Sequence, residues 1–86
     1  MIDAAQVRAA RGLLNISQTH LAEIASVHVA TIRRLEAATV VRGAADTLWK
    51  MQQALEAAGV EFIPQEEGKG AGVRLKHPNK SRLRTL

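Results

Sequence analysis

Apolar residues recur at helical spacing in the first quarter of the chain. Val7, Ala10 and Leu14 form an i, i+3, i+7 stripe, which predicts an amphipathic helix. Asp3 is a suitable N-cap for it, because its carboxylate can accept a backbone N–H that has no helical acceptor. Asn15 readily takes the left-handed conformation that ends a helix. We therefore expect a first helix that ends near Leu14.

The stretch from Ser17 to Ala37 predicts two short helices joined by a sharp turn. Ser17 is a candidate N-cap, and Ala22 is small enough to let the two helices cross closely. The inward positions are Leu21, Ala22 and Ala25 in the first of these helices, and Val27, Ile32 and Leu35 in the second.

A longer helix is expected to begin between Gly43 and Asp46 and to end at Ala58, before Gly59. Its stripe consists of Leu48, Met51, Leu55 and Ala58. Trp49 lies about 100° around the helix from Leu48. We expect it at the edge of the core, with a subunit interface as the alternative.

The pattern changes at Val60. Residues 60–63 and 73–76 are β-prone, and the stretch between them is rich in turn residues, which predicts a β-hairpin. Because a lone hairpin is marginally stable, it must pack on the helices through Phe62 or Ile63, or pair with a second chain. The candidate dimerisation residues are Trp49, Phe62, Ile63, Val73 and Leu75.

The expected organisation is an all-α, four-helix domain with a short C-terminal β-hairpin. Residues 1–59 would form the helical domain, residues 60–76 the hairpin, and residues 77–86 a basic flexible tail. With 86 residues and two aromatic side chains, the core must be small and aliphatic. The absence of cysteine excludes disulfides and thiolate metal sites. We find no export signal or membrane-spanning stretch, so a cytoplasmic protein is expected.

The positive charge is concentrated at the C-terminal end. Residues 1–72 sum to −1 and the last fourteen residues to +5. Such a tail either follows DNA phosphates as a flexible arm or only keeps the protein soluble. Net charge alone therefore does not identify a nucleic-acid-binding protein.

The stretch Ser17–Ala37 resembles the helix-turn-helix of the phage-repressor-like Xre/Cro transcription regulators. The resemblance covers roughly residues 3–60 and rests on these positions of the sequence: Gln18, Leu21-Ala22, Val27, Thr31-Ile32, Leu35-Glu36, and more distantly Arg11, Leu48 and Leu55. It departs from the family at Ser26 in the turn, at His28 where Ser or Thr usually caps the recognition helix, and at Val29. These departures concern the target sequence more than the fold.

The resemblance implies a DNA-binding surface. A helix-turn-helix presents the first half of its second helix to base edges in the major groove. The implied base-reading residues are His28, Val29, Ala30 and Arg34, and the implied backbone contacts are Gln18, Thr31, Arg33 and Arg42. His28 could instead be a helix cap facing solvent, and Arg33 could be merely solvated. The resemblance also implies an inward-turned ion pair between Arg11 and Glu36, whose alternative is two solvated charges.

The expected function is a sequence-specific DNA-binding transcription regulator. We expect a repressor that binds double-stranded DNA as a homodimer, with two recognition helices about 34–36 Å apart on an inverted repeat. The alternative is a protein-interaction module of the antitoxin or anti-activator type, whose hairpin and tail bind a protein partner. No enzyme, metal or cofactor is expected, because the three histidines have no metal-ligand spacing and the glycines do not open a helix.

Overall fold

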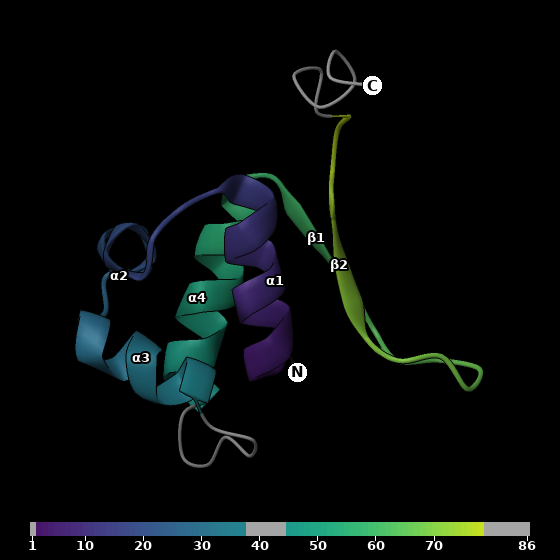
Figure 1. Ribbon diagram of the computed structural model, residues 1–86, viewed down its shortest axis with the longest axis horizontal. Helices are drawn as coiled ribbons and strands as arrows, with labels where there is room; N and C mark the ends of the chain where they lie inside the picture. Colours follow the sequence, from purple (N-terminus) through teal and green to yellow (C-terminus); the bar gives the residue numbers. More distant parts are fainter. Residues whose placement is uncertain (1, 38–44, 79–86) are drawn as a thin grey trace.

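The computed structural model describes residues 2–37 and 45–78 and has four helices and an antiparallel hairpin (Figure 1). The elements are α1 (Ala4–Leu14), α2 (Gln18–Ala25), α3 (Val29–Ala37), α4 (Ala45–Ala57), β1 (Val60–Ile63) and β2 (Gly72–Leu75). This confirms the predicted set of helices and the hairpin. Arg42 and most of the predicted tail lie outside the described residues. Within the described ranges, no helix is long and apolar enough to cross a membrane.

The predicted caps of α1 and α2 are confirmed. Asp3 accepts from Gln6 N at 2.8 Å, and the Gln6 side chain accepts from Asp3 N at 3.0 Å, which completes a capping box. Asn15 ends α1 in the left-handed conformation, with φ 56°. Ser17 Oγ accepts from His20 N at 2.9 Å at the start of α2. Ser26 ends α2 with φ 57°, in the conformation that glycine adopts most easily.

The core is aliphatic and draws on every helix. Val7, Ala10, Leu21, Ile32, Leu48, Met51 and Leu55 are each no more than 2% exposed. Two predictions about α4 are wrong. Ala58 lies beyond the end of the helix and is exposed, and Trp49 is 62% exposed, so it is not at the core edge. A subunit interface remains the untested alternative for Trp49.

The hairpin packs on the helices of its own chain. Val60 is fully buried, and Phe62 and Val73 pack against the core. The register pairs Val60 with Leu75 and Phe62 with Val73, so these four side chains share one face of the sheet. Ile63 lies on the opposite face. The hairpin and the helices therefore share one hydrophobic core, which extends across the predicted boundary between residues 59 and 60.

Gln6 joins α1 to the hairpin. Its Nε2 donates to Gly72 O at 3.0 Å and more weakly to Ile63 O at 3.4 Å, and the residue is only 6% exposed. At the hairpin tip, Glu67 and Gly68 both have positive φ, as a type I′ turn requires. In Figure 1 the hairpin lies on the opposite side of α1 and α4 from α2 and α3.

Candidate nucleic-acid interface

The second of the two short helices, α3, turns one face to the core and the other to solvent. Ile32, Leu35 and Glu36 are buried. Ala30, Arg33, Arg34 and Ala37 are exposed, and we call these four residues the α3 outer face. Its centre consists of Ala30, Arg34 and Ala37, since residues three and four apart stack on one side of a helix. The side chains along the middle of this face are therefore small at Ala30 and Ala37, and the two arginines give the face a positive charge.

His28 caps α3 with its own imidazole ring. Its Nδ1 accepts a hydrogen bond from Ala30 N at 3.1 Å, and the residue is exposed. A ring nitrogen that accepts carries no hydrogen, so the neutral ring has its hydrogen on Nε2. The cap and the predicted DNA contact are thus compatible, because Nε2–H remains a donor at the start of the α3 outer face.

Two other predicted DNA contacts are less exposed than the sequence suggested. Val29 is half-buried and packs against the core, so it lies at the margin of the α3 outer face. Thr31 is half-buried too, and its Oγ1 accepts from Arg34 Nη2 at the long distance of 3.5 Å. Val29 is half-buried because it precedes the buried Ile32 by one helical turn, and its contact with DNA bases stays a prediction.

The charges of Arg33 and Arg34 are not neutralised by carboxylates of the described chain. Within residues 2–37 and 45–78, the ion pairs join Arg11 to Glu36 and Arg74 to Glu61. Both guanidinium groups on the α3 outer face are therefore available to an anionic partner. Arg carries this charge at every accessible pH and fits phosphate or guanine with two parallel donors.

A buried carboxylate fixes the position of α3. Arg11 Nε and Nη2 donate to the two oxygens of Glu36, each at 2.7 Å, and the Glu36 side chain is 4% exposed. This bidentate hydrogen bond raises the pKa of Arg11 above its ordinary value. Arg11 Nη1 also donates to Ile16 O at 3.1 Å. The geometry agrees with the inward-turned pair and not with two solvated charges.

Gln18 also binds the Glu36 carboxylate, and we call Arg11, Gln18 and Glu36 the Glu36 cluster. Gln18 Nε2 donates to Glu36 Oε1 at 3.2 Å, so the side-chain amide is used inside the protein. Gln18 is nevertheless the first residue of α2, and the first N–H groups of a helix have no helical acceptor. A contact of Gln18 with a phosphate would therefore use its backbone N–H rather than its amide.

Sequence reasoning missed two positioning residues on α1. Arg8 Nη1 donates to the carbonyl of Glu36, one of the last carbonyls of α3, and Gln6 holds the hairpin. The spacing of Asp3 and Gln6 matches a capping box, so Gln6 could have been recognised. No pattern in the sequence indicates the contact of Arg8, which joins residues 28 positions apart.

Among residues 2–37 and 45–78, no group of three His, Asp or Glu side chains could hold a metal ion. No protein-family model matches the chain, and no curated protein matches it.

Proposed function

We propose that this protein is a sequence-specific DNA-binding transcription regulator that acts as a homodimer on an inverted repeat, most simply as a repressor. The observation that carries the proposal is the α3 outer face, where Arg34 lies between two small alanine side chains and Arg33 lies on the flank, neither of them in an ion pair with a described carboxylate. An α-helix with this profile fits the major groove of B-DNA.

The contacts follow from the position of each side chain. Ala30 and Ala37 let the helix axis approach the base pairs closely. Arg34 lies between them and would form two hydrogen bonds to guanine O6 and N7. Arg33 lies on the flank and would contact phosphate. The Nε2–H of His28 would donate to a base or phosphate acceptor at the start of the helix.

The Glu36 cluster supports the proposal, because base readout requires a helix whose position is fixed. Arg8 and Arg11 hold α3 from α1, and Gln18 holds it from the start of α2. Buried charge-assisted hydrogen bonds of this kind have strict geometry. The side chains that meet the groove would then be presented on a preorganised helix.

The test compares operator binding by two arginine variants. Arg34→Ala should weaken binding to duplex DNA from the gene's own upstream region by roughly 10²- to 10⁴-fold, the cost of two bidentate base contacts, one in each half-site. Arg74→Ala is the matched control, because Arg74 is an exposed arginine on β2, and the hairpin lies on the opposite side of α1 and α4 from α3 (Figure 1). Fluorescence anisotropy gives both affinities. An equal loss in the two variants would mean that only net charge matters, and the groove assignment would be wrong.

The predicted alternative, a module that binds a protein partner, becomes the other outcome of the experiment. Wild-type protein that shows no preference for upstream DNA over a scrambled duplex would favour it. A pull-down with the full chain would then identify the partner.

A further inference from the structure

Trp49 is the chain's one tryptophan, and its ring lies largely in solvent. It is 62% exposed on α4, whereas the other large apolar side chain exposed in the described ranges, Ile24, is 40% exposed. Burying a side chain of this size removes a large apolar area from water, which is favourable. Because the Trp49 ring is not buried in the protein's own core, a partner surface that covers it would stabilise a complex.

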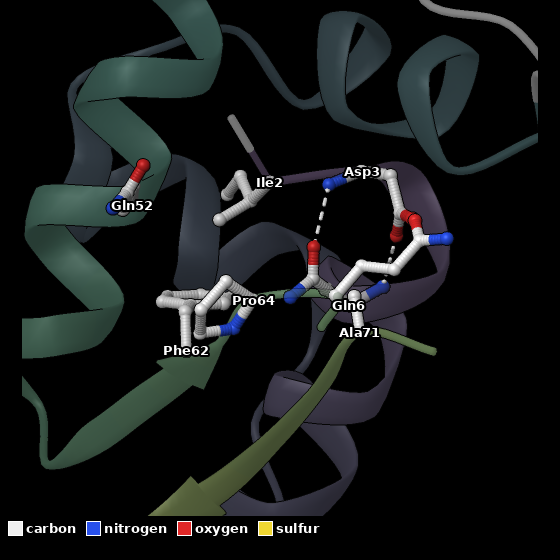
Figure 2. A pocket seen from close by; sticks show the side chains of 8 residues that line it. Ile2, Asp3, Gln6, Gln52, Phe62, Pro64 and Ala71 are labelled. Carbon is white, nitrogen blue, oxygen red and sulfur yellow. Dashed lines mark hydrogen bonds between the residues drawn. The ribbon is translucent and has the colours of Figure 1, made fainter. Parts of the chain in front are cut away.

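A pocket lies close to Trp49 on the same side of the molecule. It has a volume of about 490 Å³ and lies between the start of α1, α4 and the two ends of the hairpin loop. Figure 2 shows Gln52 of α4 on one side, Asp3, Gln6 and Ala71 on the other, and Ile2, Phe62 and Pro64 between them. Gln52 also lines the shallow hollow beside Trp49. The exposed ring and the pocket are therefore neighbours on one surface, which we call the α4–hairpin face.

We propose that the α4–hairpin face binds a second copy of this chain, with Trp49 of each copy inserted into the pocket of the other. A two-fold interface requires both halves of each contact on every protomer, and this face carries both. The inference deepens the proposed function, because it says how the homodimer would form.

The pocket has the chemistry that an indole ring requires. Ile2, Phe62 and Pro64 offer apolar surface, and a buried indole N–H also needs an acceptor. Asp3 uses one carboxylate oxygen for Gln6 N, and its other oxygen can accept from the indole. The charges are complementary as well, since the pocket is lined by a carboxylate and by no cationic side chain, while the edge of an aromatic ring is electropositive.

A second copy offers both the ring and the pocket, and the contact that it forms is small. Asp3 lines the pocket and Asp46 lines the hollow beside Trp49, with no cationic side chain among the lining residues, so the two copies repel each other at this face. The pocket and the hollow beside Trp49 are lined by eleven residues in all, fewer than the 20–30 on each side of a standard interface. The expected dimer is therefore weak and separates on dilution. α3 lies on the other side of α1 and α4 from the hairpin (Figure 1), so the hairpin part of this interface leaves both recognition helices free.

The experiment uses the full chain without DNA and has Trp49 as its own reporter. The emission of a buried indole is shifted to the blue relative to that of an exposed one. On dilution, wild-type emission should move to the red as light scattering falls from dimer to monomer mass. Trp49→Ala should be monomeric at every concentration and keep its thermal midpoint as monomer, since the ring lies outside the core.

A mixing experiment tests the pocket itself. Ala71 is exposed and lines the pocket, so Ala71→Arg should fill it and give a monomer with an exposed Trp49. Ala58→Arg, at an exposed position that does not line the pocket, is the control and should dimerise. In a mixture of Trp49→Ala and Ala71→Arg, Trp49 of the Ala71→Arg copy can still enter the open pocket of the Trp49→Ala copy. The emission of the Ala71→Arg copy should then shift to the blue as the tryptophan-free copy is added.

Three results would overturn the proposal. These are a wild-type protein that is monomeric at all concentrations, an Ala71→Arg variant as dimeric as wild type, or a mixture that gives no blue shift. The second result would place Trp49 against some other surface. None of them involves DNA, so they are distinguishable from failure of the proposed function. A dimer that does not distinguish upstream from scrambled DNA would refute that function and leave this interface intact.

Discussion

Glu36 is the residue on which the arrangement of three helices depends. Its carboxylate accepts from Arg11 of α1 and from Gln18 of α2, and its carbonyl accepts from Arg8. With a side chain that is 4% exposed, the carboxylate has little access to water. Its desolvation is offset only because hydrogen bonds reach both oxygens.

Glu36→Ala should lower the free energy of unfolding by about 3 kcal/mol, the lower end for breaking a buried pair, because the Arg11 side chain is still 22% exposed. Urea denaturation followed by circular dichroism measures this. The double variant Arg11→Met, Glu36→Leu should recover much of the loss, since it leaves no unpaired charge. A loss below about 1 kcal/mol in the single variant would indicate an ordinary surface pair.

The two roles of His28 can be separated by substitution. His28→Ala removes both the cap and the ring donor, and should cost about 1 kcal/mol of stability. His28→Ser keeps a capping oxygen and should be nearly as stable as wild type. If Nε2–H contacts DNA, both variants should lose operator affinity to a similar extent. Retention of full affinity in the serine variant would show that His28 is a cap alone.

The hairpin is a structural part of the helical domain. Val60 is fully buried, Phe62 and Val73 pack against the core, and Lys76 Nζ donates to Glu56 O near the end of α4 at 2.7 Å. A chain ending at Gly59 would lack all of these contacts. We therefore expect it to unfold, so truncation there does not separate DNA binding from partner binding.

Val60→Ala should destabilise the protein by about 1.5–3 kcal/mol, the transfer free energy of two buried methyl groups plus the cost of the cavity that they leave. Ile63→Ala is the matched control, because Ile63 is half-buried on the opposite face of the same strand. Its expected cost is less than half as large. Chemical denaturation of both variants gives the comparison, and equal costs would contradict the described packing of the hairpin.

The cross-strand pair Glu61–Arg74 should matter little, in contrast to Glu36. Arg74 donates two hydrogen bonds to Glu61 at 3.0 Å, which lowers the pKa of the Glu61 carboxyl. The pair therefore stabilises the fold above the ordinary carboxyl pKa, and this contribution disappears as the pH falls through the lowered value. Both side chains face solvent, so Glu61→Gln should barely change the urea midpoint at neutral pH. A loss comparable to that of Glu36→Ala would contradict this assignment.

Local signals in the sequence predicted the elements well. Caps such as Asp3 and Ser17 mark helix starts chemically, and the inward stripes follow directly from helical periodicity. The errors came from tertiary context. Trp49 and Val29 lie at the margin between the buried and the exposed face of their helices. Helical spacing alone does not predict whether a side chain at such a margin is buried or exposed.

The contacts between distant residues were predictable only in part. The resemblance suggested that Arg11 and Glu36 pair, but nothing local showed that Gln18 would use its amide on the same carboxylate. The burial of Val60 could not be foreseen either, because the alternation in residues 60–63 is weak and the packing face of the hairpin is set by α1 and α4.

The positions of Arg33 and Arg34 on α3 predict two kinds of DNA contact, one to phosphate and one to a base. Arg33→Ala should weaken binding to all duplexes about equally and reduce the salt dependence of log K by roughly two phosphate contacts, one from each protomer. Arg34→Ala should instead relax the preference at one base pair in each half-site. Anisotropy titrations at several salt concentrations, with singly substituted operators, separate the two. Identical behaviour of the variants would contradict their assigned roles.

Specific DNA recognition is tested by binding of the wild-type protein to its upstream duplex and to a scrambled duplex across a salt series, with a footprint of the bound site. We expect a preference of about 10³-fold or more, the lower end for specific regulators, and an inverted repeat under the footprint. Weak binding without preference that disappears as salt is raised would contradict it, since basic charge alone would then be responsible.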